Sequence, residues 1–423
     1  MASFLINGGH RLAGEHTLQG AKNSALPILA ATVASGGECI IHRCPALTDV
    51  EATLNILRHL GCGVQREGNT ITVDASSLQR GQIPEALMHE MRSSIVFLGP
   101  LLSALGRAEL SAPGGCEIGM RPIDLHLEAM QALGVEIHQA AGRLFFRAEG
   151  GLRGGRLALS FPSVGATENL MIAAATAKGI TVLTNAAREP EIVDLANFLN
   201  ACGARILGAG GGTLLIEGVQ KLHGAEHTVI PDRIAAVTYL SATAITQGEL
   251  LLRGAAPAHM DAVLAVLEQT GCRLRRLPEG LHLRAPHRLH RLPTVRTMPY
   301  PGFPTDAQAG VMTLAAVGDG TSMITETIFE NRFRHVSELR RMGASIRVED
   351  RVAVVEGVPK LHGAQVDACD LRAGASLVVA GLAAEGDTRV CSIRHVDRGC
   401  EQLELGLSAL GANIKREETD GEH

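Results

Sequence analysis

Hydrophobic and polar positions along the chain form a repeating pattern in which an apolar helical run gives way to a short alternating strand. Six times a helical segment ends in a glycine that leads into a strand, as in "RHLGCGV" and "RRMGASI". Glycine suits that place because the residue after a helix often needs a left-handed backbone. These glycines recur about every seventy residues, at Gly61, Gly134, Gly203, Gly271, Gly343 and Gly411.

A second series of glycines interleaves with the first. Six alanine-rich helical stretches each end in a glycine followed by a short strand, as in "GELLLR" and "GTSMIT". After each glycine of the first series a hairpin pattern follows, as in "CRLRRLPEGLHLRA". Most units also begin with a short strand such as "RLALS". The repeat therefore predicts six β-α-β-α-β-β units.

The first and last parts of the chain complete this scheme. The sixth unit stops after one hairpin strand, "ANIKRE", and the N-terminal "SFLING" is predicted to supply the missing partner. The second unit matches least well, in its first strand. Six units in two groups of three favour two compact α/β domains over an extended array. We place them at residues 22–230 and at residues 1–21 with 231–423.

The amino-acid composition and net charge of the chain exclude some classes of function. The chain has 423 residues, of which 46% are hydrophobic and 20% charged, with a net charge of −5 and no tryptophan. We therefore expect a globular protein without a nucleic-acid partner, since the chain has no basic tail or lysine-rich run and only two tyrosines to build an aromatic stacking platform. No run of eighteen apolar residues predicts a membrane span. The sequence makes no prediction of the oligomeric state.

Cysteines and histidines indicate neither a disulfide framework nor a metal site. The nine cysteines include no Cys-x-x-Cys pair, which favours the reducing cytosol. No G-x-G-x-x-G opens a helix after a strand, and "GAGGGT" at 208–213 is predicted to be a hairpin turn. We therefore expect no metal and no cofactor.

Polar and charged residues gather where strands lead into helices, the places at which α/β units bind ligands and helix N-termini attract anions. If the two halves face each other, the cations among them converge on one cleft that suits a small, multiply anionic substrate. The candidates are Lys22, Asn23, Asp49, Arg92, Cys116, Arg121, Ser163 to Gly165, Glu189, Glu191, Asp232, Arg233, Asp306, Arg332, Arg372, Asp397 and Arg398.

Each of these residues also has a plainer interpretation. Cys116, in "APGGCEIGMRPIDLHL", is either a packed thiol or, given the glycines and Arg121, a reactive one. Asp306 in "GFPTDAQ" precedes a helix, so an N-cap is the default explanation. A single arginine is usually solvated or salt-bridged, and only the shared position in the repeat favours more.

The motifs taken together resemble those of the UDP-N-acetylglucosamine 1-carboxyvinyltransferases, members of the enolpyruvyl transferase family. The resemblance rests on "GAKNSALP", "PGGCEIGMRPIDLHL", "FPSVGATENL", "PGFPTDAQ", "TIFENRF", "DLRAGA" and "HVDRG", in order along nearly the whole chain. It implies a two-domain inside-out α/β barrel of six β-α-β-α-β-β units. It also implies transfer of the enolpyruvyl group of phosphoenolpyruvate to the 3′-hydroxyl of UDP-N-acetylglucosamine, with release of phosphate, as the first committed step of peptidoglycan synthesis.

Roles follow by motif from this resemblance. Cys116 is the expected proton donor, and the thiol that fosfomycin alkylates, while Asp306 is the expected base toward the sugar hydroxyl. Lys22, Arg121 and Arg398 match the phosphate site of phosphoenolpyruvate, and Arg332 with Arg372 match its carboxylate side. The nucleotide-sugar site is expected to include Asn23, Arg92, Arg121, Pro122, Ile123, Asp124, Leu125, Ser163, Val164, Gly165 and Ile328.

The sequence departs from the family pattern at a few positions, and two other functions remain open. Glu117 follows the cysteine where alanine is common, and its charge is expected to raise the pKa of the thiol. The first alternative is the sister enzyme 5-enolpyruvylshikimate-3-phosphate synthase, against which the cysteine loop and "FPSVGATEN" argue. The second is an inactive paralogue that binds nucleotide sugar and regulates the pathway, against which Lys22, Cys116, Asp306 and Arg398 argue.

Overall fold

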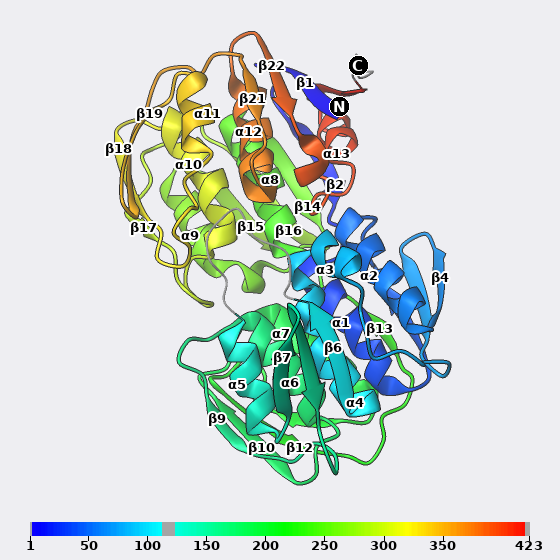
Figure 1. The fold of residues 1–423 in the computed structure, drawn as a ribbon. Helices are drawn as coiled ribbons and strands as arrows, with labels where there is room; N and C mark the ends of the chain where they lie inside the picture. Colours follow the sequence, from blue (N-terminus) through cyan, green and yellow to red (C-terminus); the bar gives the residue numbers. More distant parts are fainter. Residues whose placement is uncertain (1, 112–122, 419–423) are drawn as a thin grey trace. The chain divides into compact units, whose positions relative to one another are not determined.

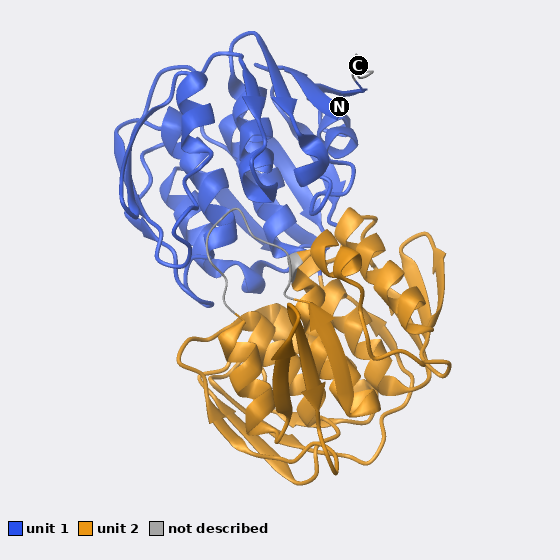
Figure 2. Ribbon diagram, viewed as in Figure 1, with its two compact units in different colours: residues 1–19, 117–120, 231–423 blue, residues 20–116, 121–230 orange. Residues whose placement is uncertain are grey.

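The structure is a computed structural model that describes residues 2–111 and 123–418. Its helices and strands divide into two compact units (Figures 1 and 2). Within the described residues, unit 1 comprises residues 2–19 and 231–418, and unit 2 comprises residues 20–111 and 123–230. Each unit contains three small sheets and its own hydrophobic core.

Unit 2 contains one sheet for each of the first three repeats. The first sheet has the order β13-β3-β5-β4, with strands Glu226–Thr228, Glu38–His42, Thr70–Asp74 and Gly63–Glu67. The second has the order β6-β8-β7, with strands Arg107–Ser111, Arg143–Arg147 and Glu136–Ala140. The third has the order β11-β12-β10-β9, with strands Arg205–Leu207, Thr213–Glu217, Ile180–Thr184 and Arg156–Ala158.

Unit 1 repeats the arrangement three times more. Its first sheet has the order β15-β16-β14-β2, with strands Arg273–Leu277, Gly280–Arg284, Glu249–Arg253 and Ala13–Thr17. The second has the order β17-β18-β20-β19, with strands Val295–Arg296, Thr321–Thr325, Val352–Glu356 and Ser345–Glu349. The third has the order β21-β22-β1-β23, with strands Gln365–Asp367, Asp387–Cys391, Ala2–Asn7 and Asn413–Glu418.

Strand pairing confirms the expected repeat, including its two irregular places. The N-terminal strand β1 pairs antiparallel with β23, with Leu5 opposite Lys415, and so supplies the hairpin partner that the sixth repeat lacks. In the second repeat the first strand is reduced to one isolated bridge, between Gln82 and Glu109. The hairpins and the turn at 208–213 also form as predicted.

Two first strands are exchanged between repeats, which the repeat pattern does not reveal. Strand β2 precedes α1 in the chain but pairs with β14 of the fourth repeat. Strand β13 precedes the fourth repeat's first helix but pairs with β3 of the first repeat. The chain therefore passes from unit 1 to unit 2 after β2 and returns after β13.

Helices at the centre of each unit are buried on nearly every side, because they consist mainly of small and apolar residues. In unit 2 these are α1 (Lys22–Ser35), α4 (Leu98–Leu105) and α6 (Val164–Ala174). In unit 1 they are α8 (Arg233–Ile245), α10 (Gln308–Val317) and α12 (Leu371–Ala383), and every residue of α8 is buried. Glycine permits the close approach, since a Cβ at Gly99 would lie 2.4 Å from the carbonyl oxygen of Asn169.

The remaining helices are amphipathic or short. The longer ones are α2 (Thr48–Leu60), α5 (Asp124–Ala132), α7 (Pro190–Ala201) and α9 (Asp261–Gln269). The shorter ones are α3 (Glu85–Glu90), α11 (Val336–Arg341) and α13 (Leu403–Ala409), with 3₁₀ turns at η1 (Arg92–Phe97), η2 (Pro257–His259), η3 (Thr305–Ala307) and η4 (Ile393–His395). In the described ranges, none of the helices is long and apolar enough to cross a membrane.

Candidate active site

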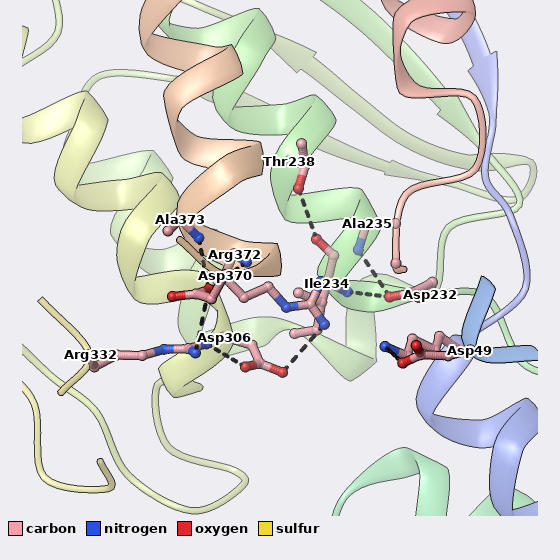
Figure 3. A network of polar contacts seen from close by, with 12 residues as sticks. Asp49, Asp232, Ile234, Ala235, Thr238, Asp306, Arg332, Asp370, Arg372 and Ala373 are labelled. Carbon is pink, nitrogen blue, oxygen red and sulfur yellow. Dashed lines mark hydrogen bonds and ion pairs between the residues drawn. The ribbon is translucent and has the colours of Figure 1, made fainter. Parts of the chain in front are cut away.

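The starts of α8, α10 and α12 bring charged side chains together in unit 1 (Figure 3). Asp232 and Asp370 are the N-caps of α8 and α12, and each accepts hydrogen bonds from two backbone N–H groups of its helix. Asp306 lies in η3, directly before α10. Arg372 is the second residue of α12, and Arg332 lies between β18 and α11. A small cavity between the three helices is lined by Asp306 and Arg372 among other residues.

Two arginines share the Asp306 carboxylate. Arg332 Nη2 donates to Asp306 Oδ1 at 2.6 Å, and Arg372 Nη2 donates to Asp306 Oδ2 at 3.4 Å (Figure 3). Arg332 Nη1 also lies 3.9 Å from Asp370 Oδ1. Asp306 is therefore shared between two guanidinium groups, the kind of side chain that binds carboxylates and phosphates through paired N–H donors.

Both arginines retain N–H groups that the described residues do not use. The side chains of Arg332 and Arg372 are only 4% and 8% exposed. Arg332 Nε and Arg372 Nη1 are buried and have no hydrogen-bond partner within residues 2–111 and 123–418. A buried donor without an acceptor costs free energy unless a ligand supplies one. The cluster therefore has buried donors that could bind a carboxylate or a phosphate.

Burial keeps the histidine beside this cluster neutral. Burial, against the opposing attraction of Asp370 and with the repulsion of Arg332, lowers the pKa of His335 to about 4. Burial also opposes the charge of Arg372, but Asp306 and Asp232 outweigh it and raise the pKa of that guanidinium. At neutral pH Arg372 is therefore charged and His335 is not.

Asp306 is not the helix N-cap that its place in the sequence suggested. Asp306 does not cap α10, since the N-cap of that helix is Ala307 and no side chain caps it. Its carboxylate, 29% exposed, is held by Arg332 and Arg372 instead. Asp306 and Arg332 come from the two strand-to-helix connections of the fifth repeat, and Arg372 comes from the first such connection of the sixth. The three connections thus meet at one carboxylate.

In unit 2, Lys22 likewise contacts an acidic residue at the start of the next helix. Lys22 is the first residue of α1, and it forms an ion pair with Asp49 at the start of α2. Both side chains are buried, at 10% and 4% exposed. Asn23 follows Lys22 and is exposed. A buried ammonium at a helix start opposes the helix dipole, so Asp49 offsets a cost that the position itself imposes.

One buried amide ties together three of the segments predicted to bind the nucleotide sugar. Asn169 Nδ2 donates to the carbonyl oxygen of Ile95 in η1 at 3.0 Å and lies 2.8 Å from His126 Nδ1 in α5. His126 packs against Gly165, where a Cβ would lie 2.9 Å from its ring. Ser163 caps α6 by accepting from the N–H of Ala166. The helix starts at 92, 124 and 164 are thereby fixed to one another.

The remaining predicted residues lie in a loop, at the start of α5, or outside the described residues. Arg398 is half-buried in the loop after η4, where Asp397 accepts two hydrogen bonds from Arg416 at 2.7 and 3.0 Å. Ile123 precedes α5, which begins with Asp124 and Leu125. Cys116, Glu117, Arg121 and Pro122 lie outside the described residues, as does the side chain of Arg92.

Sequence reasoning missed four buried or partly buried polar residues beside these groups. Asp370 and Asn169 lie inside quoted motifs or next to them, but capping and amide contacts are not visible in a motif. His335 and Glu326 were not considered. Glu326 had a usable signal, because it occupies the inward register position that follows Ser322 and Ile324 on β18. Across the described ranges, no group of three or more His, Cys, Asp and Glu side chains is arranged to bind a metal.

Glu168 in α6 is a buried glutamate of unit 2 whose protonation can be tested through the pH dependence of stability. Burial, together with the charges of Glu191 and Glu189, raises its pKa to about 8. An unfolded glutamate has a pKa of about 4.3. Between about pH 4 and pH 8 the folded state therefore keeps a proton that the unfolded state has already released. The free energy of unfolding falls as pH rises through that window.

Glu168→Gln is expected to remove this dependence. Thermal unfolding should show the variant gaining stability relative to the parent as pH is raised from about 5 to about 8. Glu217→Gln, at an exposed glutamate paired with Arg205, is the matched control. An equal difference between variant and parent at every pH would contradict the buried, protonated state of Glu168.

Comparison with known proteins identifies the family. The family model described as EPSP synthase (3-phosphoshikimate 1-carboxyvinyltransferase) matches residues 6–407. Among curated relatives, UDP-N-acetylglucosamine 1-carboxyvinyltransferase 2 of Caldanaerobacter subterraneus subsp. tengcongensis is 51% identical over 98% of this chain and 100% of its own. The chain belongs to the UDP-N-acetylglucosamine 1-carboxyvinyltransferase family of enolpyruvyl transferases. UDP-N-acetylglucosamine 1-carboxyvinyltransferase 1 of Staphylococcus epidermidis is 47% identical over 98% of this chain and 99% of its own.

Solved structures confirm the enolpyruvyl transferase fold. The enolpyruvyl transferase NikO from Streptomyces tendae matches with a TM-score of 0.87 and 27% identity over 98% of both chains. EPSP synthase from Acinetobacter baumannii matches with a TM-score of 0.76 and 18% identity, over 99% of this chain and 100% of that one. The second likeness shows the fold alone. The expected inside-out barrel of six units and the resemblance to the family are therefore both confirmed.

Proposed function

We propose that this enolpyruvyl transferase uses phosphoenolpyruvate and UDP-N-acetylglucosamine, and that it joins the enolpyruvyl group to the 3′-hydroxyl of the sugar with release of phosphate. The observation that carries the proposal is 51% identity over 98% of the chain to relatives named for this reaction. The Asp306–Arg332–Arg372 cluster supports it, because two buried guanidinium groups with unused N–H donors suit the carboxylate of a small anionic donor.

The chemistry we propose is addition followed by elimination. Cys116 delivers a proton to the vinyl CH₂ of phosphoenolpyruvate, Asp306 removes the proton of the sugar hydroxyl, and a tetrahedral ketal forms. Loss of phosphate and of one methyl proton then gives the enol ether. Lys22, Arg121 and Arg398 are assigned to the phosphate, which leaves as an anion and needs their charge. Arg332 and Arg372 are assigned to the carboxylate.

We assign the nucleotide sugar to the remaining motif residues, most of which lie at helix starts. Their backbone N–H groups and the buried amide of Asn169 favour a rigid site, which limits the entropy lost on binding. The residues proposed are Asn23, Arg92, Arg121, Pro122, Ile123, Asp124, Leu125, Ser163, Val164, Gly165 and Ile328. No cofactor is part of the proposal, and the proposed location is the cytoplasm.

A choice of acceptors tests the proposed function. We expect phosphate release from phosphoenolpyruvate to depend on added UDP-N-acetylglucosamine, and shikimate 3-phosphate to support less than about a hundredth of that rate. Release with shikimate 3-phosphate alone would assign the sister reaction. Tight binding of the nucleotide sugar without any phosphate release would instead support a regulatory paralogue.

A further inference from the structure

Glu326 is a buried carboxylate that the proposed chemistry does not use. It directly follows β18, whose inward-facing residues Ser322 and Ile324 belong to the interior. Glu326 takes the next inward position and is 1% exposed. An ionised carboxylate in such a place is costly unless several hydrogen-bond donors surround it.

Four donors from three segments surround this carboxylate. Oε1 accepts from Thr297 Oγ1 at 2.9 Å and from the backbone N–H groups of Ile328 and Phe329 at 2.8 and 3.1 Å. Oε2 accepts from Thr305 Oγ1 at 2.9 Å. Within residues 2–111 and 123–418 all four donors are uncharged, so these contacts depend on geometry rather than on an ion pair.

The two oxygens of Glu326 contact the two segments that carry Asp306 and Arg332. The Oε1 contacts fix the turn at 326–329, which leads to Arg332, and Arg332 also lies with its Cζ 5.9 Å from the ring centroid of Phe329. The Oε2 contact fixes Thr305, the residue before Asp306. Asp306 and Arg332 then meet at 2.6 Å. One side chain thus connects the backbone on both sides of that contact.

We propose that Glu326 is a positioning residue, which acts through Thr305 on Asp306 and through the turn at 326–329 on Ile328 and Arg332. The inference rests on the proposed function, in which Asp306 takes the hydroxyl proton and Ile328 contacts the nucleotide sugar. The two connections have separable consequences. Loosening Thr305 disturbs the reacting geometry and lowers kcat, whereas releasing the turn also disturbs substrate binding and raises the KM for UDP-N-acetylglucosamine.

The Thr305 connection is tested with a matched pair of variants. Thr305→Val removes the hydroxyl that Glu326 binds, while Thr305→Ser keeps it. We expect Thr305→Val to lower kcat by about 10-fold and to leave the KM for the nucleotide sugar within about 2-fold, and Thr305→Ser to keep both near the parent values. Equal kinetics for the two variants would overturn this connection, because only the hydroxyl distinguishes them at the carboxylate.

The turn connection is tested at Glu326 itself. Glu326→Ala removes all four acceptor contacts, and we expect kcat/KM to fall by about 100-fold with a higher KM for the nucleotide sugar. Glu326→Gln retains one carbonyl oxygen for the two backbone N–H groups, and its amide can donate to the Thr305 hydroxyl. We therefore expect Glu326→Gln to stay within about 10-fold of the parent. Glu338→Gln is the control, since Glu338 is a partly buried glutamate that accepts from the Asp367 N–H at 3.2 Å.

Hydrogen exchange separates this proposal from the proposed function. In the parent, the amides of Ile328 and Phe329 should exchange at least about 10-fold more slowly than in Glu326→Ala, and residues 304–308 should also lose protection in that variant. If the parent shows no turnover with UDP-N-acetylglucosamine, the proposed function fails while the exchange data still decide the role of Glu326. A folded Glu326→Ala protein with unchanged exchange, or with parental kcat and KM, would refute the positioning role.

Discussion

Replacing Cys116 by alanine is expected to lower kcat by about a thousandfold or more, whereas Cys116→Asp keeps measurable turnover. The proposed reaction begins with a proton delivered to a vinyl CH₂, a carbon that solvent water protonates slowly. A thiol with a pKa of about 8.5 is protonated at neutral pH and is a competent acid. Aspartate can replace it as an acid, but alanine cannot.

The pH dependence of the aspartate variant makes this prediction sharper. A carboxylic acid with a pKa of about 4 is protonated in only a small fraction of molecules at pH 7. The rate of Cys116→Asp should therefore rise as pH is lowered toward that value, because only the protonated form is an acid. Initial rates of phosphate release measure both effects, with Cys391→Ala as a control at a half-buried cysteine on β22. Full activity of Cys116→Ala would refute the acid role.

Asp306→Asn is the second variant with a large expected effect. Asparagine preserves the size of the side chain but cannot take a proton from the sugar hydroxyl, so kcat should fall by about 100-fold to 10,000-fold. The KM for phosphoenolpyruvate should change much less, because Arg332 and Arg372 keep their charges and gain freedom to bind the anion. Steady-state kinetics with each substrate varied in turn measure the two constants.

The control for Asp306→Asn is another aspartate of unit 1 that pairs with an arginine. Asp261 accepts from Arg276 Nη2 at 2.6 Å on the exposed surface. Asp261→Asn loses a similar pair, and because the pair is exposed, its loss should leave kcat unchanged. Parental kcat in Asp306→Asn, or equal losses in the two variants, would contradict the base role.

Much of the fold was predictable because residues close together in the sequence determine the elements of each repeat. Glycines such as Gly61 and Gly343 take left-handed conformations at helix ends, with φ of 102° and 93°, which few other residues adopt. Alternating hairpin strands likewise follow from their own sequences. The pairing of β2 with β14, and of β13 with β3, depends on residues more than 180 positions apart, and no local pattern encodes it.

The candidate site was predictable to the extent that topology determines it. Equivalent junctions of different repeats lie at equivalent ends of their helices, so Asp306 and Arg372 could be grouped before their contact was known. The ion pair of Asp306 with Arg332 was not foreseen, because the local sequence suggested an N-cap and the family resemblance implied a base, and neither role predicts an arginine partner. Glu326 was missed because an acidic residue after a strand usually marks a surface turn, whereas here four donors make burial possible.

The product formed in heavy water tests the central claim most directly. Phosphoenolpyruvate and UDP-N-acetylglucosamine are incubated with the enzyme in D₂O, and the product is examined by NMR. Addition followed by elimination passes through a methyl group, so the account predicts an enol ether on the 3′-oxygen of the sugar with deuterium in its methylene. An enol ether at another position, a methylene without deuterium, or no product would contradict the account.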